Sequence, residues 1–267
     1  MEVKKINYIM IPKELILDVT RNEKRIILYS YFASKRGLDN TIGFSCNSVV
    51  EWCGYKKNYN KDKSNDLFIA MINQFISEGY ILIDKDKINI CRDYCNIAEL
   101  DEDKFTYDSQ FAIVYLNELE RILGFKKYTK DVNRMSPAIL ILVLSYLRVN
   151  MLRRQENYIG KESDKPEFCY RMYIDIEKDI GLSNRYISRA VNILNDLDII
   201  VSQEMVRYKD ENDNWHTDVT LFVNRYKYDK QGHKDKKYNF VDELKWGIEY
   251  IKEKKYLKKK FSQDTEQ

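Results

Sequence analysis

The sequence predicts a mostly α-helical fold with small β-hairpins, of the α+β class, in which one order of elements occurs twice. Three observations carry this prediction: each half opens with a strand-like run, continues with a strongly apolar helix, and then has a short helix that ends at glycine before another helix. With 267 residues, 44% of them hydrophobic, the chain is long enough to fill two cores.

The opening of each half is an apolar strand that runs into a helix. Residues 6–11 are followed by Pro12-Lys-Glu-Leu15, with proline in a first-turn position that helices tolerate. Residues 111–115 precede a helix that covers residues 117–122 in the same way. Apolar helices at 23–35 and 137–153 come next, and we expect both to be buried scaffold helices.

A short helix that ends at glycine follows in each half, at 48–54 and at 175–181. Glycine at that point supplies the left-handed backbone conformation that turns the chain sharply into another helix. Gly54 and Gly181 therefore predict two helix-turn-helix units.

The helix after Gly181 has the clearest pattern in the chain. Its apolar residues fall on one face: Ile187, Ala190, Val191, Leu194 and Leu197. The opposite face and the helix start carry the predicted DNA-binding residues: Ser183, Asn184, Arg185, Ser188, Arg189 and Asn192. Ser183 is expected to cap the helix with its hydroxyl, beside N–H groups that favour a phosphate. The alternative is the solvated face of an ordinary amphipathic helix.

The counterpart helix in the first half has Phe68, Met71, Ile72 and Phe75 on its apolar face, but eight extra residues, 55–62, precede it. This insert and the helix start supply further predicted phosphate or base contacts: Lys56, Lys57, Asn58, Lys61, Lys63, Ser64 and Asn65. A solvated loop is the alternative interpretation of the insert.

Extended segments follow each second helix. Residues 80–83 and 87–90 predict a short hairpin, and residues 199–208 and 215–226 a longer one that adds Arg207 and Lys209 to the predicted DNA contacts. A hairpin in this place makes the unit a winged helix-turn-helix. We therefore expect two tandem winged helix-turn-helix domains, 1–92 and 109–226, joined by an acidic linker, 93–108.

The charge is nearly balanced, with 45 Lys and Arg against 42 Asp and Glu, so any basic surface is local. The tail, 227–267, is such a region: residues 225–260 contain 13 Lys and Arg against 6 Asp and Glu. A helix is expected over 240–261, and we expect it to dock on the core, contact DNA or recruit replication proteins.

Several classes of protein are disfavoured. The start of the chain lacks a secretory pattern and no apolar run could span a bilayer, so we expect a cytoplasmic protein without membrane contact. The five cysteines are an odd number on a chain that shows no export signal, so we expect reduced thiols. Cys46, Cys53, Cys91 and Cys95 lack the spacing of a zinc site, and we expect them to be buried thiols. A phosphate-binding glycine loop and closely paired histidines are also missing, which predicts no enzyme, metal or cofactor.

The arrangement resembles the tandem winged-helix replication initiators of low-GC Gram-positive plasmids and phages. The resemblance covers residues 6–226 and rests on the opening Ile11-Pro-Lys-Glu-Leu15, the apolar helix after it and the repeated helix-turn-helix. It implies binding of repeated origin sequences in double-stranded DNA. The long insert before the first recognition helix departs from the family's tight turn.

The expected function is thus sequence-specific binding of double-stranded DNA, as a replication initiator of a plasmid or phage. A transcriptional regulator or a conjugation accessory protein is the alternative, and a palindromic site would then imply a homodimer. A rival of another class is a winged-helix protein-interaction module.

Overall fold

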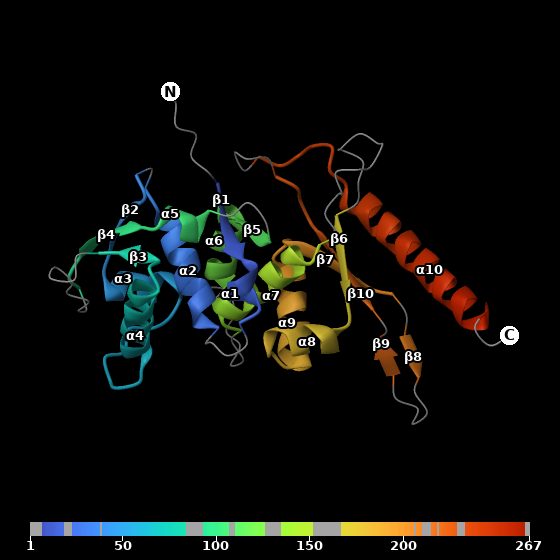
Figure 1. Ribbon diagram of the computed structural model, residues 1–267, viewed down its shortest axis with the longest axis horizontal. Helices are drawn as coiled ribbons and strands as arrows, with labels where there is room; N and C mark the ends of the chain where they lie inside the picture. Colours follow the sequence, from blue (N-terminus) through green and yellow to red (C-terminus); the bar gives the residue numbers. More distant parts are fainter. Residues whose placement is uncertain are drawn as a thin grey trace. The chain divides into compact units, whose positions relative to one another are not determined.

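The computed structural model describes residues 7–18, 23–37, 39–83, 93–106, 110–125, 135–151, 167–205, 207–209, 215–217, 219–228 and 233–264. This part of the chain contains helices and small antiparallel sheets (Figure 1), so the predicted α+β class is confirmed. No helix in it combines the length and apolar character needed to cross a membrane. Residues 87–90, expected as a strand of the first hairpin, lie outside the described residues.

The chain divides into two compact units, and these do not coincide with the two predicted domains. Unit 1 contains Met1–Val149 with Lys230–His233, and unit 2 contains Asn150–Asp229 with Lys234–Gln267. The boundary therefore lies after residue 149 and not at the predicted linker.

The opening elements of both halves share one core within unit 1. Strand β1 (Tyr8–Pro12) pairs antiparallel with β5 (Phe111–Tyr115), and each strand runs into a short helix, α1 (Lys13–Ile16) or α6 (Leu116–Gly124). The two scaffold helices, α2 (Lys24–Lys35) and α7 (Pro137–Val149), pack against each other. This shared core is the physical reason why the chain does not separate at its middle.

The rest of unit 1 runs β2 (Thr41–Phe44), α3 (Cys46–Trp52), α4 (Ser64–Ser77), β3 (Ile81–Leu82), β4 (Asn96–Leu100) and α5 (Glu102–Phe105). The strands form an antiparallel sheet in the order β2-β4-β3.

The predicted linker, 93–108, is wrong because it contains β4, the central strand of this sheet. Its acidic stretch, 99–103, lies on the exposed side of β4 and at the start of α5, where Asp101 caps the helix by accepting a hydrogen bond from Asp103 N (3.0 Å). Acidic composition here reflects a solvated strand face and a helix start.

Unit 2 has the same order of elements as β2 to β4 of unit 1: a strand, two helices and then further strands. It runs β6 (Phe168–Arg171), α8 (Tyr173–Ile180), α9 (Asn184–Asp196), β7 (Ile200–Glu204), β8 (Arg207–Lys209), β9 (Trp215–Thr217), β10 (Thr220–Asn224) and α10 (Phe240–Asp264). The main sheet has the order β6-β10-β7, with the last strand in the centre as in unit 1, and β8 pairs with β9. Strands β2 and β6 were not predicted.

The tail helix α10 covers one face of the β6-β10-β7 sheet (Figure 1). The buried cluster between them contains Phe168, Leu221, Val223 and Ile251, and Phe240, Leu244 and Ile248 pack against it. The close approach requires Gly247, because a Cβ at this position would lie 2.8 Å from Leu221 Cδ1 and 3.3 Å from Phe168 Cγ. The helix predicted over 240–261 is confirmed, and it docks on its own unit.

Candidate nucleic-acid interface

A tight glycine turn joins α8 to α9. Helix α8 ends at Gly181, whose φ of 69° and ψ of 15° are left-handed, and its N–H donates to Glu177 O (2.9 Å). Helix α9 begins at Asn184, only three residues later. The predicted role of Gly181 in this turn is confirmed.

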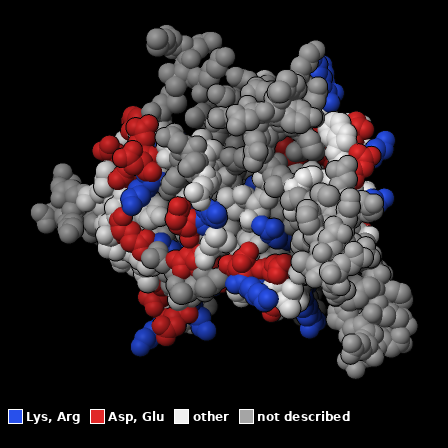
Figure 2. All heavy atoms as spheres, turned by 45° about the vertical axis from the view of Figure 1, so that its right-hand side comes forward, with Lys and Arg blue, Asp and Glu red and all other residues white. Residues whose placement is uncertain are grey.

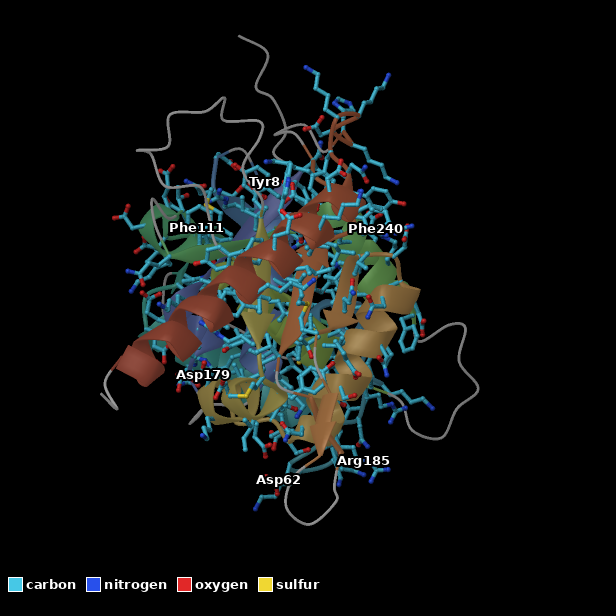
Figure 3. All side chains as sticks on the ribbon, turned by 90° about the vertical axis from the view of Figure 1, so that its right-hand side faces the viewer. Tyr8, Asp62, Phe111, Asp179, Arg185 and Phe240 are labelled. Atoms are coloured by element: carbon cyan, nitrogen blue, oxygen red, sulfur yellow. The ribbon has the colours of Figure 1, made fainter. Side chains whose placement is uncertain are left out.

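Helix α9 separates apolar and polar residues as its periodicity predicted. Ile187, Ala190, Val191 and Leu194 are fully buried, whereas Asn184, Arg185 and Asn192 are exposed and Ser188 and Arg189 half-buried. Figure 3 shows Arg185 at the periphery, near the start of the helix. Leu197, expected on the apolar face, is the C-cap and is only half-buried.

The two arginines of α9 are available for a ligand. Among the described residues neither Arg185 nor Arg189 has a hydrogen-bond or ion-pair partner, and the helix contains no acidic residue before Asp196. A guanidinium group offers paired donors that match the O6 and N7 acceptors of guanine in the major groove. One helical turn separates the two, so both can point toward one groove.

Ser183 holds the N-cap position, but the predicted cap is wrong. Its hydroxyl makes no capping hydrogen bond, and its carbonyl accepts from Tyr186 N (2.8 Å) and Ile187 N (3.1 Å) instead. The exposed hydroxyl is therefore open to solvent or to a phosphate oxygen.

Tyr186 is a surface residue that the sequence analysis missed. Its side chain is 51% exposed, directly after Arg185, which is unusual for a large aromatic side chain on a well-packed helix. The signal was its helical position on the polar face, and the 21 tyrosines of the chain obscured it.

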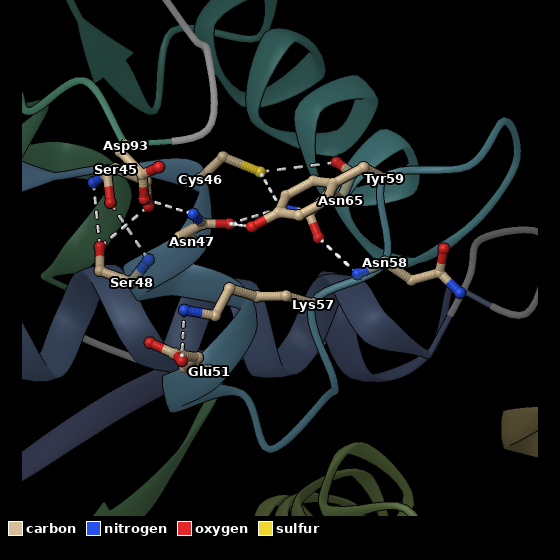
Figure 4. Close-up of polar contacts among 10 residues, drawn as sticks. All are labelled: Ser45, Cys46, Asn47, Ser48, Glu51, Lys57, Asn58, Tyr59, Asn65 and Asp93. Carbon is tan, nitrogen blue, oxygen red and sulfur yellow. Dashed lines mark hydrogen bonds and ion pairs between the residues drawn. The ribbon is translucent and has the colours of Figure 1, made fainter.

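The insert before α4 is held by side-chain hydrogen bonds (Figure 4). Lys56, Lys57, Asn58, Lys61 and Lys63 are exposed, as their prediction as phosphate contacts requires. Lys57 Nζ lies 2.7 Å from Glu51 Oε1, and this contact raises the pKa of Lys57. Glu51 therefore neutralises part of the positive charge of the insert.

Asn65, predicted to contact DNA, is a buried anchor of the insert. It is 2% exposed; its Oδ1 accepts from Asn58 N (2.8 Å) and its Nδ2 donates to Asn47 Oδ1 (2.8 Å). Ser64 is likewise occupied, because its hydroxyl donates to Lys56 O. These contacts leave the four lysines as the candidate phosphate contacts of the insert.

Replacing Asn65 with alanine is expected to lower the free energy of unfolding of unit 1 by about 1–3 kcal/mol, because it leaves the buried Asn47 amide short of a partner. Urea denaturation would measure this loss. Asn60→Ala, on the exposed part of the insert, is the control and should change stability by less than about 0.5 kcal/mol. Equal stabilities of the two variants would contradict the anchoring role.

The exposed face of α4 differs from that of α9. Its exposed residues are Asp66, Leu67, Ala70, Asn73, Gln74 and Ser77, and the helix contains no lysine or arginine. Unit 1 therefore repeats the order of elements but lacks cationic base-reading side chains on this helix.

The structure describes only the backbone of the hairpin β8–β9 in unit 2. Arg207 and Lys209 lie on β8, where they pair with Thr217 and Trp215 of β9, and their side chains lie outside the described part. Figure 2 shows acidic and basic side chains interspersed over the described part of one face. The described residues on this face therefore form no broad basic surface.

The cysteines that the structure describes are free thiols. Cys46, Cys53 and Cys169 are buried, and Cys95 is exposed, unlike the buried thiol expected there; Cys91 lies outside the described residues. Burial raises the pKa of Cys169 to about 12 and also raises that of Cys46, which disfavours the thiolate that binds metal. No group of three or more metal-ligating side chains occurs in the described ranges.

No protein-family model matches the chain, and no curated protein is significantly similar to it in sequence.

Proposed function

We propose that the protein binds double-stranded DNA through α9. In this proposal α8, the Gly181 turn, α9 and the hairpin after it form a winged helix-turn-helix, and β2 to β4 with α3 and α4 form a second copy. One observation carries it: among the described residues, Arg185 and Arg189 of α9 have no hydrogen-bond or ion-pair partner, and the opposite face of this helix is fully buried.

The side chains of α9 divide into base-reading and phosphate-binding groups. Arg185 and Arg189 read guanine, while Asn184 or Asn192 pairs with the N6 and N7 of adenine. Ser183 and the Tyr186 hydroxyl contact phosphates, as do the exposed lysines of the insert in unit 1. The base-reading chemistry thus lies in unit 2, and the first copy contributes mainly affinity that does not depend on sequence.

Replication initiation at a plasmid or phage origin is the biological role that we propose for this binding. A repeated order of elements suits an origin with repeated sequences, and the role rests on the resemblance of the sequence to tandem winged-helix initiators. A transcriptional regulator or a conjugation accessory protein would use the same chemistry. Direct repeats in or beside the gene favour the initiator, and a promoter palindrome favours a dimeric regulator.

Gel-shift titrations against duplexes tiled over the gene and its flanks test the proposal. Arg185→Ala or Arg189→Ala should each weaken binding to the preferred duplex by about 1–3 kcal/mol, roughly 5- to 150-fold, and relax specificity. Lys57→Gln is the control and should weaken binding to all duplexes slightly and alike. Absent binding, or equal affinity for random DNA at moderate salt, would refute sequence-specific recognition.

A protein-interaction module is the second candidate. Met172 and Ile174, at the start of α8, are 37% and 49% exposed, and exposed apolar side chains of this kind favour protein contact. Unchanged affinity for nucleic acid after removal of both α9 arginines would favour this candidate.

A further inference from the structure

The sheet β2-β4-β3 of unit 1 has an exposed outer face with apolar side chains on it. Ile97 of β4 is 76% exposed and Leu82 of β3 is 45% exposed. Side chains at alternate positions point to the inner face and are buried, among them Ala98 of β4 and Phe44 of β2. The ring of Phe44 contacts that of Phe32 in α2, with 5.3 Å between the centroids. The outer face is therefore the side of the sheet that points away from the core.

Unit 2 shows how the corresponding face can be covered. Both sheets have the last strand in the centre, β4 in one and β10 in the other. On β10, Phe222 lies on the α8 side, with its ring 6.4 Å from that of Tyr173, and Leu221 and Val223 lie beneath α10. Helix α10 covers them with a docking stripe of apolar residues: Phe240, Leu244, Ile248 and Ile251. The outer face of the unit 1 sheet is thus the counterpart of a face that an amphipathic helix buries in this same chain.

Gly43 marks a notch in this outer face. It lies inside β2, directly opposite Ile97 in the register, and is exposed. Its φ is not left-handed, so the backbone does not require glycine here. Among the described residues a Cβ at this position would meet only Cys95 Sγ, at 3.6 Å, an ordinary contact distance. Glycine inside a strand weakens it and often marks a place where another backbone approaches closely, as Gly247 of α10 does in unit 2.

Carboxylates lie beside the notch and at the end of β4. Glu99 is on the same face of β4 as Ile97 and pairs in register with Leu82. Glu102 and Asp103 follow in the first turn of α5. Within the described part of the chain these three carboxylates have no ion-pair partner. Their charge favours a partner with cationic side chains.

We propose that the outer face of the β2-β4-β3 sheet is a docking site for an amphipathic helix of a partner protein, with lysine or arginine flanking its apolar stripe. The stripe packs on Ile97 and Leu82 and places one side chain in the notch at Gly43, while the cations pair with Glu99 and the start of α5. This apolar patch is smaller than the one beneath α10, which suits a partner that associates reversibly. The inference goes beyond DNA binding and does not depend on it.

A synthetic helix labelled with a fluorophore is the probe, and its anisotropy is measured during titration with the full-length protein. It carries leucine at i, i+4, i+7 and i+11 and lysine at the flanking positions. A second helix has glutamate in place of every lysine. The wild-type protein should bind the lysine helix about tenfold or more tightly than the glutamate helix, because of the carboxylates on the face.

Two variants test the face itself. Ile97→Lys and Gly43→Val should each weaken binding of the lysine helix about tenfold or more. Gly43→Val should also unfold at the same temperature as the wild type or at a higher one, because valine favours strands and its Cβ has room. Loss of binding by a variant of undiminished stability then reports the filled notch and not a damaged fold. Val241→Lys, at a 41% exposed position of α10, is the matched control and should bind the helix like the wild type.

Three results would overturn the proposal. The first is equal binding of the two helices by the wild type, or wild-type affinity in both face variants. The second is a loss of the same size in Val241→Lys, which would show that the helix binds without preference for this face. The third comes from sedimentation velocity of the protein alone: a dimer that Ile97→Lys dissociates would make the face an interface between copies of this chain. DNA binding should be the same in all three variants, so the two proposals can fail separately.

Discussion

Replacing Glu118 with alanine is expected to destabilise unit 1 by about 3–5 kcal/mol. Glu118 is 1% exposed and pairs with Arg148, which is 6% exposed; both guanidinium nitrogens contact its carboxylate, at 2.6 and 2.8 Å. Arg148 also donates to Ile113 O (2.8 Å), and Glu118 accepts from Tyr115 N (3.1 Å). Removal of Glu118 leaves a buried cation without its counter-charge in the core that joins β5, α6 and α7. Urea denaturation followed by circular dichroism measures the loss.

Two further variants separate this ion pair from general damage to α6. Glu120→Ala, on the exposed side of the same helix, should change stability by less than about 0.5 kcal/mol. The double variant with Glu118→Leu and Arg148→Met should recover part of the loss, since it removes both buried charges together. A single Glu118 variant as stable as the Glu120 variant would contradict the structural role of the pair.

Ending the chain at Asn239, before α10, is expected to destabilise unit 2 by on the order of 5 kcal/mol. Phe168, Leu221 and Val223 are at most 1% exposed beneath this helix, and uncovering side chains of this size costs about 1.5–3 kcal/mol each. The truncated protein should also bind the dye ANS, because the uncovered sheet face is apolar. Differential scanning calorimetry of both proteins would measure the change in unfolding temperature.

A chain that ends at Lys252 is the control for this truncation. It retains the docking stripe through Ile251 and should unfold close to the temperature of the full chain. If the chain ending at Asn239 were as stable as this control, α10 would not be a structural part of unit 2.

Most of the correct sequence-based predictions rest on strong helical periodicity. The apolar face of α9, the glycine turn before it and the extent of α10 follow from spacings of three and four residues and from one left-handed position, all of them local signals. Strands β2 and β6 have four residues each, too few for a period to appear, and each is defined by pairing with a distant strand.

The errors also have physical causes. Asn65 was predicted at the interface because asparagine in a polar stretch resembles a base-reading residue, and only the tertiary contact with Asn47 shows that it is buried. β4 resembles a linker in the sequence because the polar Asn96 is buried and the apolar Ile97 is 76% exposed, so no clean alternation appears, and an acidic turn follows the strand. Base contacts from unit 1 would need suitable side chains on the exposed face of α4. The sequence alone already shows that this helix contains no lysine or arginine.

The pairing of β1 with β5 also bears on how the chain is made. Tyr8 and Tyr115 are register partners, and α2 packs on a helix that ends at Val149. A nascent chain therefore cannot complete the core of unit 1 until more than half of its residues have left the ribosome, although domains generally fold in order from the N-terminus. Until then the apolar faces of β1 and α2 remain exposed to solvent. The part of the protein that is synthesised first is therefore accessible to chaperones and proteases for the longest time.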